Sequence, residues 1–332
     1  MKCAIFVEIF TAMNWKLAIV LPCYNEEAII GESVARVKAK IAALASAGRI
    51  DAGSCVIAVD DGSSDGSWSI IESIADGTVV HGVKLSHNAG HQNALLAGLE
   101  EALTLGADAV VTIDADLQDD IEAIDKMVEA WHEGSQIVYG VRSDRHSDSL
   151  LKRWSASQFY SIMTHSGANV LPNHADFRLM SRTAVEMLLQ YGERNMFLRG
   201  IVPMIGLKTA TVEYARLPRT GGESKYPIRK MLSLAAEGIT SFTVRPVRMI
   251  FIVGLIFLII TISVAAYVLI SMAMGRNYPG WASLMLSLWF IGSLVLIALG
   301  IIGEYVSKIY LEVKHRPRYF VERRTPRRPN NP

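Results

Sequence analysis

Two long uncharged apolar runs near the C-terminal end constrain the architecture of this 332-residue chain more than any other feature. The first run covers residues 249–273 and the second covers residues 282–303, and neither contains Asp, Glu, Lys or Arg. About 20 apolar residues in a helix suffice to cross the hydrocarbon core of a bilayer. Both runs, separated by a polar break at residues 274–281, are longer and purer than the buried helices of soluble proteins. We therefore expect a hairpin of two transmembrane helices within residues 248–304.

The basic residues around these runs predict how the chain crosses the membrane. Arg245 and Arg248 precede the first run, whereas the connecting loop holds only Arg276. Eight cations follow the second run: Lys308, Lys314, Arg316, Arg318, Arg323, Arg324, Arg327 and Arg328. Because loops rich in Lys and Arg stay in the cytoplasm, we expect both termini and all residues before the first run on that side. The basic cytoplasmic tail, residues 305–332, either lies against anionic headgroups or is solvated.

The composition outside the two runs is that of an ordinary domain. The whole chain is 51% apolar, and 33 Lys and Arg balance 32 Asp and Glu to a net charge of +1. This balance argues against a nucleic-acid partner and against an acidic disordered chain. The three cysteines have neither a zinc-ligand spacing nor a plausible disulfide framework.

Two shorter segments border the domain that we place at residues 16–226. Residues 1–15 form an N-terminal extension that is too short to cross a membrane and lacks the cleavage site of a signal peptide, and Met13 is an alternative start. Residues 227–247 are cationic at their start and apolar at helical spacing, which predicts a juxtamembrane amphipathic helix. This helix lies either in the membrane interface or against the domain.

Short apolar runs alternate with helical stretches in the first half of the chain. Strands are expected at LAIVLP (17–22), CVIAVDD (55–61), VVHGVKL (79–85) and AVVTIDAD (109–116), with helices between them. Strand, helix and strand in that order are typical of an α/β domain with a parallel sheet.

Polar residues end these strands, where open parallel sheets bind their ligands. They are Asn25, Glu26, Glu27, Asp60, Asp61, Asn88, Asp114 and Asp116. The first strand leads into PCYNEE (22–27) rather than a glycine-rich turn, which argues against a dinucleotide cofactor. Carboxylates repel bare phosphate, so they indicate a metal ion or hydrogen bonds to base and ribose.

The motif DADLQDD (114–120) is the sharpest of these strand ends. Alternation along a strand places Asp114 and Asp116 on one face while Ala115 points away. With the carboxamide of Gln118 they form a hard-oxygen set suited to Mg²⁺ or Mn²⁺. We therefore predict a metal site at Asp114, Asp116 and Gln118, with Mg²⁺ or Mn²⁺ as cofactor.

Eight strings of residues together resemble one enzyme family. They are PCYNEE (22–27), VDDGSSD (59–65), HNAGHQNAL (87–95), DADLQD (114–119), ADFRLMSR (175–182), FLRGIVPMIG (197–206), RTGGESKYP (219–227) and IIGEYVSKIYLEVKHRPRY (301–319). In their order and spacing they resemble the family 2 glycosyltransferases of GT-A fold. Within that family the chain is similar to the membrane-anchored polyprenyl-phosphate glycosyltransferases related to dolichol-phosphate mannose synthase and bactoprenol glucosyltransferase. The resemblance covers nearly the whole chain and implies a Rossmann-like GT-A nucleotide-diphospho-sugar transferase domain before the hairpin.

The resemblance implies a nucleotide-sugar site built from the strand ends. Its expected residues are Pro22, Tyr24, Glu26, Asp60, Asp61, Asn88 and Asp114. Asp61 is expected on the base or ribose, and the metal is expected against the donor pyrophosphate. The family commonly has a proline pair after DLQD, whereas Asp120 and Ile121 stand here, which leaves the local turn open.

The acceptor that the resemblance implies is a polyprenyl phosphate. Such a phosphate carries an ionised oxygen near neutral pH because its second pKa is about 6, so a strong general base is unnecessary. It needs cations instead, and guanidinium groups match phosphate geometry. The expected acceptor-phosphate residues are Arg142, Arg153, Arg178, Arg199, Arg219, Ser224 and Lys225. The expected catalytic residues are Asp116, Asp176 and Arg178, and a structural salt bridge between the last two is the alternative.

We therefore expect a metal-dependent glycosyltransferase that moves one sugar, glucose or a related hexose, from a UDP-linked donor to undecaprenyl phosphate. The resemblance implies that the transfer inverts the anomeric carbon of the sugar and that it takes place at the cytoplasmic face of a bacterial inner membrane. It also implies a lipid-linked sugar product that serves the modification of cell-envelope glycans. A homo-oligomer, with a tetramer as the guess, is also expected. The identity of the sugar and the choice between UDP and GDP stay open.

Other classes of protein fit the sequence less well. A GDP-mannose transferase similar to dolichol-phosphate mannose synthase is the first alternative. A processive polysaccharide synthase would carry a QxxRW signature, but Leu150 stands where Gln belongs before Arg153 and Trp154. A non-catalytic membrane scaffold would leave the aspartate-rich strand ends unexplained.

Overall fold

The computed structural model describes residues 15–143, 174–194, 197–215 and 280–327, and scattered residues between 250 and 274. The chain divides into two compact units. The first unit holds residues 1–160, 169–225 and 316–332, and the second holds residues 161–168 and 226–315.

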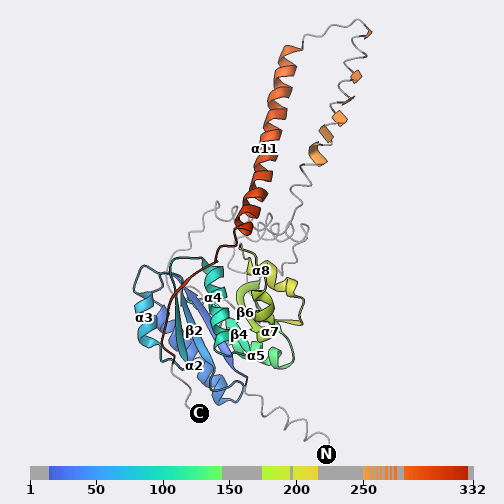
Figure 1. Cartoon of the computed structure of the whole chain (residues 1–332). Coiled ribbons are helices and arrows are strands. Elements are labelled where there is room, and N and C mark those ends of the chain that lie inside the picture. The colour runs from blue at the N-terminus through green and yellow to red at the C-terminus, as the bar shows by residue number, and fades with distance from the viewer. Residues whose placement is uncertain are drawn as a thin grey trace, which may run out of the picture. The chain divides into compact units, whose positions relative to one another are not determined.

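An eight-stranded sheet forms the centre of the first unit (Figure 1). Its strands are β1 (Leu17–Cys23), β2 (Cys55–Asp60), β3 (Val80–Leu85), β4 (Ala109–Thr112), β5 (Ile137–Arg142), β6 (His174–Ser181), β7 (Thr209–Tyr214) and β8 (Val321–Arg324). They lie in the order β7-β5-β6-β4-β1-β2-β3-β8. Strands β6 and β8 run against their neighbours, and the other strands share one direction. The prediction of an α/β domain with a mostly parallel sheet is confirmed.

Helices cover both faces of this sheet. They are α2 (Ile30–Ser46), α3 (Ser67–Ile74), α4 (His91–Thr104), α5 (Ala123–His132), α7 (Arg182–Leu189) and α8 (Leu198–Ile201), followed by the 3₁₀ helix η2 (Val202–Ile205). Helices α2, α3 and α5 pack on one face and α4 with α7 on the other. Strands β1, β2 and β4 are therefore buried along their whole length, which explains their near-continuous apolar sequences.

Helix α4 lies unusually close to the sheet because of one glycine. A Cβ atom added at Gly98 would lie 2.3 Å from Cγ1 of Val20 and 3.0 Å from Cγ2 of Val59. Only glycine therefore allows this approach without a shift of the helix or the strands. Since α4 begins at His91, its distance from the sheet also sets the position of that side chain.

The C-terminal segment of the first unit differs from the expected tail. Strand β8 pairs antiparallel with β3, and the hydroxyl of the buried Thr325 accepts the Gly82 N–H at 2.8 Å. The buried carboxylate of Glu101 in α4 accepts Nε of Arg324 at 2.8 Å and also pairs with Arg327. These two arginines, expected at headgroups or in solvent, thus bind a carboxylate of the domain. Strand β8 was not predicted, because it is short and charged and its residues do not alternate between apolar and polar.

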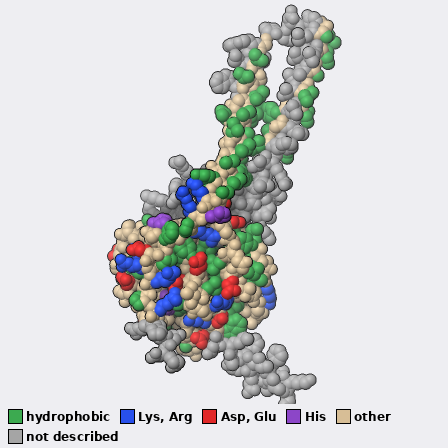
Figure 2. All heavy atoms as spheres, viewed as in Figure 1, with side chains coloured by type: hydrophobic (Ala, Val, Ile, Leu, Met, Phe, Trp, Pro, Cys, Tyr) green, Lys and Arg blue, Asp and Glu red, His purple; other side chains and the backbone are tan. Residues whose placement is uncertain are grey.

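One long helix, α11 (Trp281–Val313), dominates the described part of the second unit. Within it, Phe290–Val313 has a mean hydropathy of 1.9 and no buried residues, and most of its side chains are hydrophobic (Figure 2). It is the one helix among the described residues that is long and apolar enough to cross a membrane. Helix α11 extends ten residues beyond the predicted end of the second run at residue 303.

Several expected segments lie outside the described residues. They include most of residues 1–15 and the predicted juxtamembrane helix at 227–247. The first apolar run is described only at scattered positions, which are helical from residue 250 to residue 273. The two-helix hairpin is therefore not shown.

Candidate active site

Two loops at the carboxyl ends of β1 and β2 are tied together. Asn25, whose φ of 54° lies in the left-handed region, donates its N–H to Oγ of Ser63 at 2.9 Å. The Asn25 carboxamide in turn accepts the Ser64 N–H at 2.9 Å, and the Glu27 carboxylate accepts the Gly66 N–H at 2.9 Å. These bonds hold residues 25–27 in a loop, and helix α2 begins after it at Ile30.

The aspartates at the end of β2 are buried and differ in their partners. The Asp61 carboxylate accepts the N–H groups of Ala89 at 2.7 Å and Gly90 at 3.0 Å, which fixes the loop before α4. The Asp60 carboxylate accepts the Ser63 N–H at 3.2 Å, and its Oδ2 has no partner among the described residues. Burial raises the pKa of both carboxyls above the ordinary value.

The DADLQDD motif forms a tight turn after β4. The Leu117 N–H bonds to the Asp114 carbonyl at 3.1 Å, and Leu117 adopts a left-handed φ of 45°. The Gln118 N–H bonds to the Asp116 carboxylate at 3.2 Å, and Oγ of Ser33 in α2 donates to the Ala115 carbonyl at 2.6 Å. The turn is thus held without the proline pair that is common in the family.

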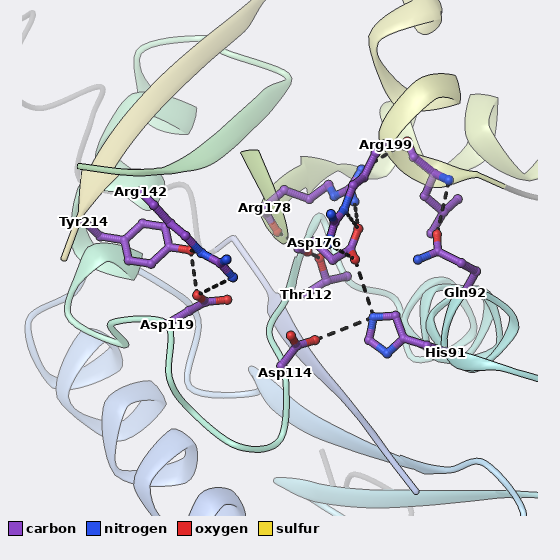
Figure 3. A network of polar contacts seen from close by, with 11 residues as sticks. His91, Gln92, Thr112, Asp114, Asp119, Arg142, Asp176, Arg178, Arg199 and Tyr214 are labelled. Atoms are coloured by element: carbon purple, nitrogen blue, oxygen red, sulfur yellow. Dashed lines mark hydrogen bonds and ion pairs between the residues drawn. The ribbon is translucent and has the colours of Figure 1, made fainter. Parts of the chain in front are cut away.

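A network of charged side chains surrounds Asp176 on β6 (Figure 3). Its carboxylate, only 6% exposed, binds Arg178 at 2.6 Å and Nη2 of Arg199 at 2.9 Å. Nε2 of His91, the first residue of α4, lies 3.6 Å from Oδ2 of Asp176 and also 3.6 Å from Oδ1 of Asp114. The antiparallel pairing of β4 with β6 brings these residues together, since Thr112 lies opposite Arg178.

A second polar group lies beside the first at the ends of β5 and β7. The hydroxyl of Tyr214 donates to the buried Asp119 carboxylate at 2.6 Å. Nη2 of Arg142 lies 3.4 Å from the same carboxylate, and its Nε lies 3.3 Å from the Tyr214 oxygen (Figure 3). Arg142 keeps 31% of its side chain exposed, so it reaches the surface although its partner Asp119 is buried.

The pKa values in the Asp176 network move in opposite directions. Loss of solvent raises the pKa of Asp114 to about 6, and the nearby Asp176 charge adds to this while His91 opposes it. Burial also disfavours a charged Asp176, but Arg199, His91 and Arg178 outweigh it and hold its pKa well below the ordinary value. Desolvation disfavours a charged His91, yet the contact with Asp176 and the charge of Asp114 raise its pKa overall.

The predicted metal ligands fit a hard divalent cation. Asp114 and Asp116 are partly exposed on one turn, and a cation would offset both the loss of solvent and the neighbouring carboxylates that raise the pKa of Asp114. The amide of Gln118 is 5% exposed, and its Nε2 has no hydrogen-bond partner in the described part of the chain. Among the described residues, no group of three or more His, Cys, Asp or Glu side chains has metal-binding geometry, so such a site would use two carboxylates and an amide.

The remaining predicted residues fall into three groups. Pro22 is buried within β1, whereas Tyr24 is 46% exposed and Asn88 is exposed in the loop before α4. Glu26 is partly exposed, and its N–H donates to Oγ of Ser67 at 2.9 Å. The remaining predicted acceptor residues lie outside the described residues: Arg153, Arg219, Ser224 and Lys225.

Three residues of the site were not expected from the sequence. Asp119 and Tyr214 are 95 positions apart, and Gln92 accepts the N–H of Leu198 at 3.1 Å across 106 positions. Asp119 belongs to the quoted DADLQD string, which was a usable signal. Gln92 belongs to the quoted HNAGHQNAL string, whereas nothing in the local pattern marks Tyr214.

Comparison with known proteins identifies the family. The family model described as "Glycosyl transferase family 2" matches residues 18–189, which run from the second residue of β1 to the end of α7. The chain belongs to glycosyl transferase family 2.

Relatives match far more than this domain. "Uncharacterized glycosyltransferase YkoT" of Bacillus subtilis is 46% identical over 92% of this chain and 91% of its own length. The bactoprenol glucosyl transferase of Shigella phage SfX is 38% identical over 81% of this chain and 88% of its own length. Among solved structures, glucosyl-3-phosphoglycerate synthase of Mycobacterium tuberculosis aligns with 70% of this chain and 78% of its own, at 21% identity and a TM-score of 0.44. This last likeness is too slight to bear on function.

Proposed function

We propose that this chain transfers one hexose from a nucleotide diphosphate sugar, UDP-linked in the first instance, to a polyprenyl phosphate. The observation that carries the proposal is the match to the bactoprenol glucosyl transferase of phage SfX, which covers 81% of the chain. The family 2 domain ends at residue 189, so the match extends into the part of the chain that follows it. That part includes the apolar helix, as expected for an enzyme with a lipid acceptor.

The donor side of the proposed reaction lies over the ends of β1, β2 and β4. The loops 24–27 and 61–66 are mutually bonded, which offers a preformed surface for the nucleotide with Asp61 toward the base or ribose. Tyr24 is exposed at this surface and Asn88 borders it. We assign the nucleotide-sugar site to Pro22, Tyr24, Glu26, Asp60, Asp61, Asn88 and Asp114.

We assign Asp114, Asp116 and Gln118 to hold Mg²⁺ or Mn²⁺. When bound, such a cation stabilises the negative charge that develops on the leaving pyrophosphate. The turn from Asp114 to Gln118 is fixed by its own hydrogen bonds and by Ser33, so the backbone that carries the two carboxylates needs little reorganisation. Their role is to orient the donor.

The acceptor phosphate is proposed to meet Arg142 and Arg199, which keep 31% and 41% of their side chains exposed. Arg178 is only 1% exposed, so we assign it the positioning of Asp176 rather than direct contact with the phosphate. Arg153, Arg219, Ser224 and Lys225 complete the proposed acceptor set. The phosphate oxygen attacks the anomeric carbon while the bond to the nucleotide diphosphate breaks on the opposite side, which inverts that carbon.

The membrane arrangement belongs to the same proposal. The rings of Phe257 in the first apolar run and Phe290 in α11 lie 5.5 Å apart, which supports a hairpin of two spans. With cations on both flanks, we propose a multi-pass bacterial inner-membrane protein whose catalytic domain and termini are cytoplasmic. Assembly into a homo-oligomer, such as a tetramer, is part of this proposal.

The experiment that tests the donor side is a screen of radiolabelled nucleotide sugars with the purified full chain, Mg²⁺ and a short polyprenyl phosphate. We expect transfer from a UDP-hexose, and transfer from GDP-mannose instead would favour the first alternative.

Asp116→Asn should lower transfer on the order of 100-fold, since it removes a charge that holds the cation. Asp120→Asn is the matched control, because among the described residues the Asp120 carboxylate accepts only the Glu122 N–H, a bond that Asn keeps. No transfer from any nucleotide sugar would contradict the proposal and favour a scaffold.

A further inference from the structure

His91 lies between two carboxylates that belong to different parts of the site. Its Nε2 is 3.6 Å from Asp114 on the β4 turn and 3.6 Å from Asp176 on β6 (Figure 3). Both distances exceed those of a hydrogen bond, so the ring is not committed to either carboxylate.

The two carboxylates are held very differently. Asp176 is 6% exposed and is fixed by Arg178 at 2.6 Å and by Arg199 at 2.9 Å. Asp114 is 44% exposed, and among the described residues His91 is the one basic side chain within 4.0 Å of its carboxylate. The imidazole therefore connects an adjustable carboxylate to a rigid one.

The support of His91 is also rigid. The preceding residue, Gly90, donates its N–H to the buried Asp61 at 3.0 Å. The following residue, Gln92, accepts the N–H of Leu198 at 3.1 Å, which joins the first turn of α4 to α8. The imidazole is thus carried on a helix end that both neighbouring residues anchor.

We propose that His91 is a positioning residue of the sugar transfer: its imidazole holds the Asp114 carboxylate in the orientation that receives the cation-bound diphosphate of the donor. The inference rests on the function proposed above. A side chain that orients a metal-binding carboxylate from outside the hydrophobic core affects the affinity for the bound donor more than the stability of the fold.

Two substitutions separate this role from a merely structural one. His91→Leu removes the N–H, whereas His91→Gln places an amide N–H close to where Nε2 stood. We expect His91→Leu to weaken Mn²⁺-dependent binding of UDP, or of GDP if that is the donor base, by about tenfold or more. His91→Gln should recover most of that loss. His132→Gln is the control, since His132 lies beside Trp131 and Trp15 at the opposite end of the strands.

The measurement is calorimetric titration of UDP and GDP into the full chain in detergent with Mn²⁺, accompanied by the KM for the nucleotide sugar and for a short polyprenyl phosphate. The donor KM should rise in His91→Leu while the acceptor KM and the thermal midpoint of unfolding stay at the wild-type values. Wild-type nucleotide affinity in His91→Leu, or no recovery of that affinity in His91→Gln, overturns this inference and leaves the proposed function standing. A wild-type chain that binds neither nucleotide overturns the proposed function, and the inference with it.

Discussion

A single carboxylate, Asp76, illustrates how one side chain stabilises a connection in this domain. It accepts the N–H groups of Thr78, Val79 and Val80 at 2.7–3.0 Å and the Lys38 ammonium at 2.8 Å, and so closes the turn between α3 and β3. Partial burial alone would raise its pKa, but Lys38 and the three N–H groups outweigh this and lower the pKa below the ordinary value.

The lowered pKa of Asp76 has a defined consequence for stability. Because the folded state favours the charged carboxylate, its contribution is present above the unfolded-state pKa of about 3.9 and is lost as the pH falls below it. We expect Asp76→Asn to lower the free energy of unfolding by about 1–2 kcal/mol at pH 7, and by less at pH 3.5. Urea unfolding followed by tryptophan fluorescence at both pH values checks this. A difference between variant and wild type that does not shrink in acid would contradict it.

At the scale of elements, the contact of α4 with the sheet depends on the absence of a side chain at Gly98. Alanine there gains about 1 kcal/mol in helix propensity. Its Cβ would lie 2.3 Å from Val20, however, and the stiff valine in a buried strand cannot move aside, which costs about 1–3 kcal/mol. We expect Gly98→Ala to be destabilising on balance in thermal unfolding.

Gly31 in α2 is the matched control for Gly98. The nearest atom to a Cβ there, Cγ2 of Ile70, lies at 3.4 Å, which is close to an ordinary contact. Gly31→Ala should therefore be neutral or stabilising. Equal effects of the two substitutions would show that the close approach of α4 is not what Gly98 provides.

The return of the C-terminal segment to the sheet rests on Glu101. This carboxylate is 4% exposed and pairs with Arg324 and Arg327, which are themselves 52% and 42% exposed. We expect Glu101→Gln to cost about 1–3 kcal/mol, and to raise amide hydrogen exchange at residues 321–327 before the rest of the sheet. Glu72→Gln, an exposed change on α3, serves as control. Unchanged exchange at β8 would mean that its pairing with β3 suffices without the ion pairs.

The sequence predicted the elements whose signal is local and missed those whose signal is not. Strands β1, β2 and β4 follow from apolar runs that are buried on both faces, and β3 follows from one that is buried except at Lys84. Strand β8, with the sequence VERR, depends on a partner strand more than 230 positions away, since Thr325 bonds to Gly82 across 243 positions. In the site, Asp114 and Asp116 were predicted because they follow an apolar strand, but β4 ends at Thr112 and both lie in the turn after it, so the expected alternation along a strand was wrong. Tyr214 was missed because it meets Asp119 from β7, a strand placed by its pairing with β5.

At the scale of the whole molecule, we propose that a membrane anchor follows the family 2 glycosyltransferase domain. Exposure of the apolar surface of Phe290–Val313 to water is unfavourable. We therefore expect the full chain to stay with membranes after an alkaline carbonate wash and to require detergent for release. Immunoblots of the supernatant and pellet test this. Release by carbonate alone would contradict a membrane-spanning α11.

The most direct test of the central claim is mass spectrometry of the lipid formed when the purified full chain is incubated with a UDP-hexose, Mg²⁺ and a polyprenyl phosphate. We expect the polyprenyl phosphate to gain one hexose with the wild-type chain, and Asp116→Asn to form little of this product. A lipid that gains no sugar while the donor is consumed, or that gains a chain of sugars, would contradict transfer of a single hexose to a polyprenyl phosphate.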